Sequence, residues 1–401
     1  MPKKLTARLA LVTISCALAL FGCVFTACAP SQTTGAQVAA SESSSSVESA
    51  QPELANCPVS RDTTFGGIYL DISIDEFNNL GFSLGDSVNV KFSNGYELQN
   101  VPYLDGYNVR AGDPLVIGNP SDTRIEVTLN YVDTLWDTAG VAEGDTATVT
   151  LAEKGAFKDL RELLSDRESD ERSDYDSDEQ FANFRPLKGG ALRQGAVYRS
   201  SSPINNKHNR APYVNKLTEQ AGITFVLDLS HKADEIEEEI AKNSQQGADL
   251  SHIARMQSEG RVDAVGLSVN YLSQPFAEKL ASALIEMTQH DAPCLITCSK
   301  GKDRTGFACA LLEGLCGATY DEIVADYMLT YENYYGITKE SSPKKYEAIL
   351  YLHLDDMLEY LIHAEDGADL SKVDFAPYAR EYLKKGGMTD EQIDALIAHI
   401  T

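Results

Sequence analysis

The sequence predicts an α/β fold, a mainly parallel sheet flanked by helices, preceded by a small all-β barrel or sandwich domain. Three observations support this fold class. Short alternating strand patterns separated by glycine and proline fill residues 58–156. Apolar strand patterns alternate with helical patterns over residues 181–401, which is typical of a parallel sheet covered by helices. The hydrophobic share of 43% over 401 residues is large enough to build a core in each region.

The N-terminus has the pattern of a secretory signal. Two lysines and an arginine precede an apolar run over residues 9–21, which is shorter than the roughly 20 apolar residues that a membrane-spanning helix needs. The run ends in a Leu-Phe-Gly-Cys string at residues 20–23, which resembles a bacterial lipobox. We therefore expect residues 1–22 to be a lipoprotein signal peptide and Cys23 to be lipidated, so that the exported protein is anchored to the outer face of the bacterial cytoplasmic membrane. Cys28 is a second lipidation candidate, and an ordinary cleaved signal is the alternative.

Residues 23–57 are rich in serine and poor in apolar side chains, so we expect a flexible tether. In the all-β domain that follows, residues 87–92 alternate apolar and polar side chains and lead into an Asn94-Gly95 hairpin signal. Further strand patterns lie at residues 115–117, 125–129 and 146–151. This pattern is similar to the C-terminal β domain of SAM hydroxide adenosyltransferases. The other domain of that family has no counterpart here, so the resemblance implies no site residue, and we expect a binding or spacer role.

Residues 157–180 form a strongly acidic linker, which we expect to be a solvated connector or an exposed helix. The α/β pattern after it comprises strands at residues 224–229 and 294–297, helices at residues 275–289 and from Thr305 onward, and a final helix that starts with a Thr389–Gln392 capping box.

The motif that carries chemistry lies between the strand at residues 294–297 and the helix that follows. It reads Cys298-Ser299-Lys300-Gly301-Lys302-Asp303-Arg304-Thr305-Gly306. A cysteine before a helix N-terminus faces backbone N–H groups and the positive end of the helix dipole, which stabilise the nucleophilic thiolate. The five residues before Arg304 let the loop curl around a tetrahedral anion, and its guanidinium can bind two phosphate oxygens. The sequence therefore predicts attack of sulfur on a phosphoryl group.

This string resembles the loop of the cysteine-dependent protein tyrosine phosphatase family, particularly the bacterial branch that reads Cys-x-x-Gly-Lys-Asp-Arg-Thr-Gly. Further segments that match the family are Asn183-Phe184-Arg185, Tyr198-Arg199-Ser200, Val226-Leu227-Asp228-Leu229 and Gly387-Met388-Thr389. The resemblance covers residues 181–401 and implies a tyrosine-phosphatase-like catalytic domain. It implies a hydrolase of the protein-tyrosine-phosphatase class that forms a phosphocysteine intermediate and removes phosphate from a phosphorylated protein.

The resemblance implies roles for the loop residues. Cys298 would be the nucleophile, Arg304 would bind phosphate, and the Thr305 hydroxyl would help the sulfur to leave. The residues that would bind substrate through the loop are Ser299, Lys300, Gly301 and Lys302.

Two carboxylates are candidates for the general acid. Asp303 is the first, because this branch carries an acid within the loop, and an ion pair with Lys302 or Arg199 is its structural alternative. Asp228 is the second, with a structural cap at a strand end as its alternative role. Arg199 would orient the loop or the substrate, or form a structural ion pair.

One residue departs from the family. The family has histidine immediately before the nucleophile, where this chain has Thr297. Because that histidine shapes the loop and stabilises the thiolate, a catalytically weak, phosphate-binding pseudophosphatase is an alternative. Lys300 and Lys302 add positive charge to the loop, so a phosphoinositide or inositol polyphosphate is an alternative substrate, unless both lysines offset nearby carboxylates.

Charge and residue spacing limit the remaining functions. The net charge of −26 argues against a nucleic-acid partner. We expect no cofactor and no metal, because arginine and backbone N–H groups neutralise the phosphate, and the histidines lack ligand spacing and are expected at the surface. Cys294, Cys309 and Cys316 are expected in the core. An adhesion or scaffold function of residues 62–152 is the alternative to an enzyme.

Overall fold

The structure is a computed structural model that describes residues 51–401 except residues 121, 133–134 and 166. These residues belong to one compact unit, Ala50–Thr401. The predicted signal peptide, Cys23 and the tether up to residue 50 lie outside the described residues.

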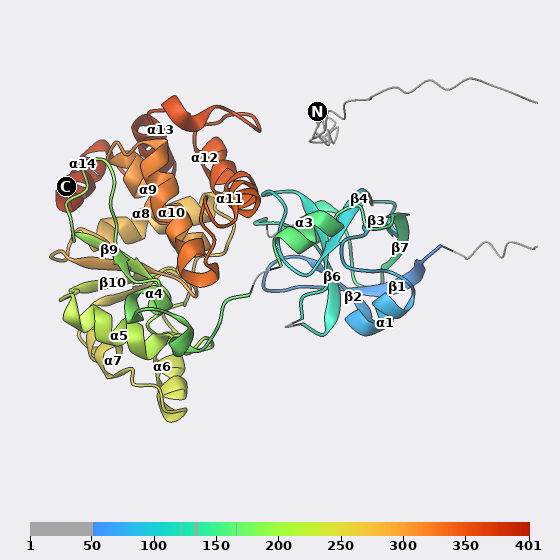
Figure 1. Cartoon of the computed structure of the whole chain (residues 1–401), viewed down its shortest axis with the longest axis horizontal. Helices are drawn as coiled ribbons and strands as arrows, with labels where there is room; N and C mark the ends of the chain where they lie inside the picture. Colours follow the sequence, from blue (N-terminus) through green and yellow to red (C-terminus); the bar gives the residue numbers. More distant parts are fainter. Residues whose placement is uncertain (1–50, 121, 133–134, 166) are drawn as a thin grey trace, which may run out of the picture. The chain divides into compact units, whose positions relative to one another are not determined.

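The N-terminal region of the described chain forms a closed barrel with the strand order β1-β2-β6-β5-β4-β3-β7 (Figure 1). Its strands are β1 (Glu53–Arg61), β2 (Ile68–Ser73), β3 (Ser87–Phe92), β4 (Glu97–Leu104), β5 (Pro114–Ile117), β6 (Arg124–Leu129) and β7 (Thr146–Glu153). The predicted alternation on β3 is confirmed, because Val88, Val90 and Phe92 are buried in the barrel core. The predicted hairpin after β3 is confirmed by its antiparallel pairing with β4. The short helices beside these strands are α1 (Ile74–Asn79), α2 (Leu135–Thr138) and α3 (Lys158–Leu163).

Strand β1 begins earlier than the sequence suggested. Its first residue, Glu53, lies within residues 23–57, which were expected to be tether. Glu53 pairs with Thr150 of β7, and Val59 pairs with Leu70 of β2. Closing the barrel requires both pairings, because an unclosed sheet would leave an edge of unpaired backbone groups.

The C-terminal region contains a sheet with the order β11-β10-β12-β9-β8. Its strands are β8 (Arg185–Pro186), β9 (Val197–Ser200), β10 (Phe225–Asp228), β11 (Val262–Ala264) and β12 (Cys294–Thr297). Strands β9 to β12 pair in parallel, and the edge strand β8 pairs antiparallel with β9. The sheet is therefore mainly parallel, as the strand–helix alternation predicted.

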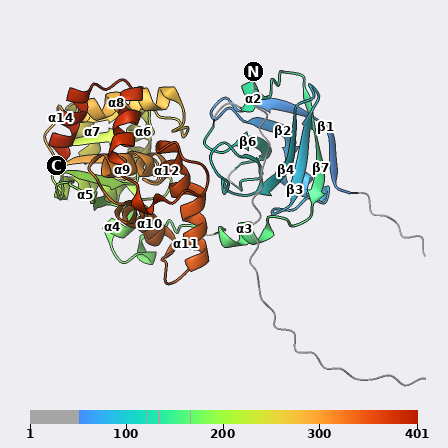
Figure 2. The ribbon, with the colours of Figure 1, turned by 90° about the horizontal axis from the view of Figure 1, so that it is seen from above.

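Helices cover both faces of this sheet, as Figures 1 and 2 show. Along β10 and β12, Val226 and Leu295 pack in one core with α5 (Ala211–Gln220), α6 (Ile236–Gln245) and α7 (Ser251–Ser258). Leu227 and Ile296 point to the other face and pack in a second core. That core includes α8 (Gln274–Met287), α9 (Asp303–Leu315), α10 (Tyr320–Tyr335), α13 (Ala376–Lys385) and α14 (Asp390–Ile400). The remaining segments are η1 (Arg172–Asp174), α4 (Asp178–Ala182), α11 (Pro343–Ile349), the π-helical turn η2 (Leu350–Leu354), α12 (Asp355–Leu361) and η3 (Leu370–Lys372).

The helix signals in the sequence act as expected. Thr389 and Gln392 form the predicted capping box of α14. Ser273 caps α8, and proline occupies its first turn. Helix α9 begins at Asp303, two residues before the predicted start. Cys294, Cys309 and Cys316 are buried, which confirms that they are core residues.

Across the described ranges, no helix combines the length and the apolar character that crossing a bilayer requires.

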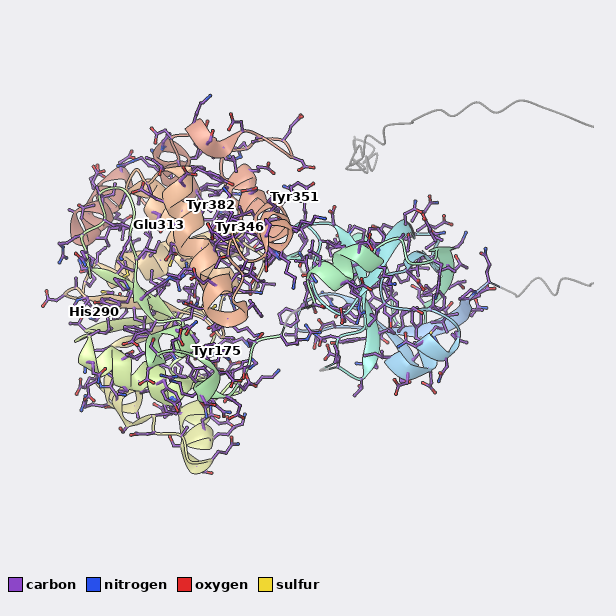
Figure 3. All side chains as sticks on the ribbon, in the orientation of Figure 1. Tyr175, His290, Glu313, Tyr346, Tyr351 and Tyr382 are labelled. Atoms are coloured by element: carbon purple, nitrogen blue, oxygen red, sulfur yellow. The ribbon has the colours of Figure 1, made fainter. Side chains whose placement is uncertain are left out.

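A buried charge cluster joins the barrel to the α12 region. Arg110, from the segment between β4 and β5, lies 2.8 Å from Asp356, 2.5 Å from Glu359 and 2.7 Å from Asp366. Its guanidinium also lies 4.8 Å from the ring centre of Tyr351, which is labelled in Figure 3. Because Glu359 and Asp356 are almost fully buried, each depends on Arg110 for neutralisation.

We predict that Arg110→Gln lowers the free energy of unfolding by about 3–5 kcal/mol, because it leaves buried carboxylates without their cation. Chemical denaturation of the full chain measures this change. The matched control is Arg124→Gln, an exposed barrel arginine that contacts Ser60 and the ring of Tyr69, which should cost less than about 1 kcal/mol. Equal losses in the two variants would contradict a stabilising role for the cluster.

Candidate active site

The predicted loop lies where the sequence placed it, between β12 and α9. Cys298 follows β12 directly and is 3% exposed. Gly301, in the middle of the loop, has a φ of +63°. A Cβ at this position would lie 2.1 Å from the carbonyl oxygen of Ser200. The loop therefore presses so closely against the end of β9 that only glycine fits.

A buried network of hydrogen bonds and ion pairs supports the loop. Arg199 donates a hydrogen bond from Nη2 to the Gly301 carbonyl oxygen at 2.9 Å and pairs through Nη1 with Asp326 of α10. Arg185 donates from Nε to the same carboxylate at 2.9 Å. Burial raises the pKa of Asp326, but the two arginines outweigh it and hold the pKa below its usual value. Arg199 is 1% exposed and bonded to the loop carbonyl, which favours a role in orienting the loop over a contact with substrate.

Glu313 of α9, which is labelled in Figure 3, interacts electrostatically with the charged groups of this network. It is 1% exposed, and burial together with the nearby Asp326 raises its pKa well above the usual value. Burial therefore favours the neutral form of the Glu313 carboxyl group beneath the loop.

The loop presents unused donors. Among the described residues, none of the hydrogen bonds is donated by a backbone N–H group of residues 299–304. Buried backbone donors are normally paired. Consecutive unpaired N–H groups before a helix N-terminus are a binding site for an anion.

The Arg304 side chain lies on the Ser299 side of the loop. It donates from Nη1 to the Leu267 carbonyl oxygen at 3.0 Å and from Nη2 to Ser299 Oγ at 3.4 Å. Together with Ser299 and His231 it lines a cavity of about 450 Å³. Three glutamates, Glu235, Glu238 and Glu239, also line this cavity.

The two threonines that flank the loop make different contacts. Thr305 is fully buried, and its hydroxyl has no hydrogen-bond partner within the described residues, so it is not bonded to Cys298 here. The Thr297 hydroxyl lies 3.0 Å from the Ser200 carbonyl oxygen and 2.8 Å from that of Ser201. Thr297 therefore ties β12 to the chain after β9 and does not direct its proton at the sulfur.

Both loop lysines are paired with carboxylates. Lys300 contacts Glu168 of the acidic linker, and Lys302 Nζ lies 3.7 Å from Asp303 Oδ1. Burial raises the pKa of Glu168, but Lys300 outweighs it and lowers the pKa to about 2. The linker is thus not wholly solvated as expected, because Glu168 is buried against the loop. The lysines do not by themselves favour a polyphosphorylated ligand, since a neighbouring carboxylate offsets the charge of each.

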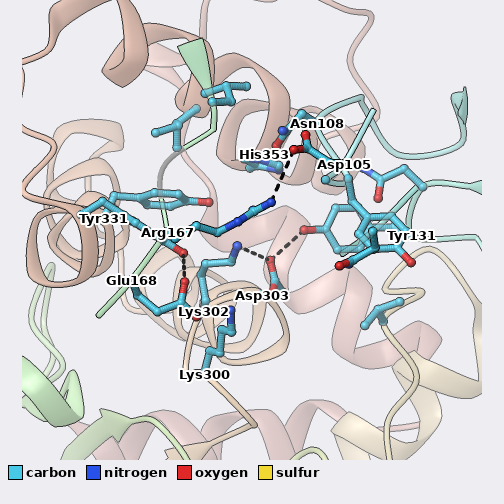
Figure 4. Close-up of a pocket in the computed structure, with 18 of the residues that line it drawn as sticks. Asp105, Asn108, Tyr131, Arg167, Glu168, Lys300, Lys302, Asp303, Tyr331 and His353 are labelled. Carbon is cyan, nitrogen blue, oxygen red and sulfur yellow. Dashed lines mark hydrogen bonds and ion pairs between the residues drawn. The ribbon is translucent and has the colours of Figure 1, made fainter. Parts of the chain in front are cut away.

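Asp303 lies at a second cavity of about 750 Å³, shown in Figure 4. Its Oδ1 accepts a hydrogen bond from the Tyr131 hydroxyl at 2.8 Å. Burial raises the pKa of Asp303, but Lys302 and the Tyr131 hydrogen bond outweigh burial and lower it. His353, from the π-helical turn η2, lies at the same cavity, and burial lowers its pKa to about 4, so it is neutral.

Asp228, the alternative acid, is fully buried at the end of β10. Its Oδ1 accepts hydrogen bonds from Ser230 N–H at 2.8 Å and from the Ser230 hydroxyl at 2.7 Å. Its Oδ2 lies 2.7 Å from Nδ1 of His231. Both oxygens are occupied, which favours the structural cap that the sequence left open. The Asp228 carboxylate holds His231, which lines the cavity of Arg304. Asp228 itself is not among the residues that line this cavity.

The expectation that the histidines lie at the surface is wrong for three of them. His231, His252 and His353 are buried. His231 is hydrogen-bonded to the Asp228 carboxylate, His252 lies beside Arg255, and the ring of His353 stacks near that of Tyr331. Burial lowers the pKa of His231, but the Asp228 carboxylate outweighs burial and raises it.

Sequence reasoning missed Tyr131, Glu168 and His231. Asp228 and His231 stand three residues apart after a strand, and that spacing was a usable signal. Tyr131 and Glu168 carried no such signal, because their partners lie far away in the sequence.

The comparisons with known proteins identify part of the chain. A family model described as "Tyrosine phosphatase family" matches residues 179–401. No curated protein matches the chain. A solved structure described as "Crystal structure of uncharacterized conserved protein from Thermotoga maritima" is 24% identical and covers 24% of this chain, with a TM-score of 0.21. The match spans 35% of that protein's chain, and at this TM-score it carries no inference about fold.

We predict that Gly301→Ala weakens binding of inorganic phosphate tenfold or more, since each hydrogen bond to a charged group contributes about 1.5–3 kcal/mol. The new methyl group must displace the loop from the Ser200 carbonyl. Titration calorimetry measures the affinity. Gly317→Ala is the matched control, because Gly317 also has a positive φ, of +77°, but nothing lies within 4 Å of its Cβ position. Phosphate binding that is equal in both variants would contradict the close fit of the loop.

We predict that the Asp228–His231 pair stabilises the fold in a pH-dependent manner. Because the folded pKa of His231 is raised, the contribution of its charge is complete below the unfolded pKa of about 6.5 and is lost as the pH rises through the folded pKa. His231→Gln keeps a neutral donor, so it should cost about 1–2 kcal/mol in acid and less in alkali. Thermal unfolding at two pH values tests this. His363→Gln, an exposed histidine, is the control, and a cost that grows with pH would contradict the prediction.

Proposed function

Because the chain belongs to the tyrosine phosphatase family over residues 179–401, we propose that it is a phosphomonoester hydrolase of protein-tyrosine or dual-specificity type that works through a phosphocysteine intermediate. The observation that carries this proposal is the position of Cys298 at the base of a loop whose backbone N–H groups are unpaired. Arg304 lies on the same loop, with its guanidinium against Ser299. These groups supply the nucleophile and the positive environment that a phosphoryl group needs.

In the first step, the Cys298 thiolate attacks phosphorus, a sulfur–phosphorus bond forms, and the bond from phosphorus to the leaving oxygen breaks. The loop N–H groups and Arg304 bind the equatorial oxygens, where negative charge is concentrated. Asp303 donates a proton to the leaving oxygen. Its pKa is low in the free protein, and a bound phosphate dianion raises the pKa of a neighbouring carboxyl group by like-charge repulsion.

In the second step, water attacks phosphorus, and the sulfur–phosphorus bond breaks. Asp303, now a carboxylate, accepts the proton of the water. The thiolate leaves with a hydrogen bond from Thr305. That hydroxyl is buried without a partner within the described residues, which supports the role.

A phosphorylated protein is the substrate that this proposal favours. A phosphoinositide or inositol polyphosphate is the second candidate. The positive charges of Lys300 and Lys302 suggested this substrate. Their pairing with Glu168 and Asp303 offsets these charges, so they no longer favour it. The pseudophosphatase alternative rests on Thr297, whose hydroxyl is bonded to the strand and contributes nothing to the sulfur.

We further propose that the protein is exported and anchored to the outer face of the bacterial cytoplasmic membrane by lipid on Cys23. The charged and apolar pattern of residues 1–22 supports this location. Mass spectrometry of the mature N-terminus, with Cys23→Ser as the control, tests it. A mature protein that begins at another residue and carries no lipid would contradict the proposal.

We predict that Cys298→Ser lowers kcat for p-nitrophenyl phosphate roughly 10⁴-fold or more, the scale seen when a catalytic nucleophile is removed. Phosphate binding should persist, because the loop N–H groups remain. Arg304→Lys should lose about 10²–10³-fold, because an ammonium group cannot replace the planar fork. Cys57→Ser, which makes the same change at a buried barrel cysteine, is the control. Turnover by the Cys298 variant at the wild-type rate would contradict the mechanism.

A further inference from the structure

We propose that the barrel domain completes the leaving-group side of the active site and that Tyr131 is a positioning residue for Asp303. This inference rests on the proposed function, because it assigns a support to the general acid named there. It also gives the barrel a role in the reaction, in place of a spacer.

The contact itself is direct. The Tyr131 hydroxyl donates to Asp303 Oδ1 at 2.8 Å, and Figure 4 shows the phenol pointing at the carboxylate. Lys302 approaches the same oxygen, at 3.7 Å. The structure gives Asp303 Oδ2 no partner within the described residues, so that oxygen is left to carry the transferable proton.

The backbone conformation of Tyr131 and the packing of its ring hold the phenol in place. Its backbone adopts a φ of +56°, a left-handed conformation that is unfavourable for an aromatic residue and is often retained at functional sites. The ring packs against Tyr271, with 5.5 Å between centroids, and Tyr271 in turn stacks on Phe307 of α9. Packing on the helix that carries Asp303 therefore fixes the phenol relative to the acid.

The cavity around this pair has walls from both domains. Phe65 and Tyr107 from the barrel are 46% and 41% exposed, and both line it. Tyr335 and His353 line it from the C-terminal region. These aromatic walls suit an aromatic or apolar leaving group, whose oxygen must lie near Asp303 to receive the proton.

The test compares two substrates in the full chain. Tyr131→Phe removes only the hydroxyl. A weakly basic leaving group such as p-nitrophenol needs little protonation, whereas phenol needs it strongly. We expect kcat/KM to fall about tenfold for phenyl phosphate and less than about twofold for p-nitrophenyl phosphate, since general acid catalysis contributes roughly 10²–10⁴-fold in total. The matched control is Tyr96→Phe, a barrel tyrosine outside the cavity.

The pH profile gives a second readout. The hydrogen bond from Tyr131 stabilises the Asp303 carboxylate. The other charged or titratable groups that act on it are Lys302, His353, Arg304, Tyr327, Tyr331 and Tyr335. Losing that hydrogen bond raises the pKa of Asp303, so the basic limb of the kcat/KM profile should move to higher pH. A purely structural role for Tyr131 would leave this limb in place.

The following outcomes overturn the inference. Equal losses for both substrates, or no loss for either, would show that Tyr131 does not position the acid. In the Asp303→Asn background, Tyr131→Phe should cause no further loss, and a full additional loss would also contradict the coupling. Activity that does not depend on Cys298 would instead overturn the proposed function, so the two failures are distinguishable.

Discussion

The close approach of Gly301 to the end of β9 is the constraint on which the site depends. The loop can present its N–H groups in one direction only because its backbone touches the Ser200 carbonyl where a side chain would otherwise lie. Arg199 fixes the Gly301 carbonyl from below, and Asp326 keeps that arginine in place. The positive environment of the loop is thus built on a buried ion pair, which provides orientation more than stability.

The site is also shaped by residues that come from different regions of the chain. Tyr131 comes from the barrel and Glu168 from the linker, and both contact residues of the loop. The cluster around Arg110 holds the barrel against the α12 region at a separate place. Residues on either side of the cavity therefore have fixed partners, and the barrel supplies part of the environment of the proposed acid.

Much of the fold and the centre of the site could be predicted from the sequence. The alternation of Val88, Val90 and Phe92 predicted a half-buried strand because side chains alternate along an extended backbone. The string from Cys298 to Gly306 predicted a loop before a helix because its residues are consecutive and their geometry is local. The start of β1 could not be predicted, since it is set by pairing with β7, almost a whole domain later.

The rest of the site could not be predicted for the same reason. Tyr131 reaches Asp303 across 172 residues, and nothing in its neighbours reports that contact. Glu168 looked like one of many solvated carboxylates, and only the fold shows that it is buried against Lys300. Asp228 was the alternative candidate for the acid, with a structural cap at a strand end as its other role, and the structure shows its oxygens bound to Ser230 and His231.

The contact of Glu168 with Lys300 has a consequence for how this architecture evolves. A connector that only joins two modules can gain or lose residues without harm. Here the connector carries Glu168, which pairs with Lys300 of the loop. An insertion between α3 and Glu168 would move that carboxylate away from Lys300. Exchange of the barrel for another module would therefore have to preserve the length of this segment and the carboxylate that faces Lys300.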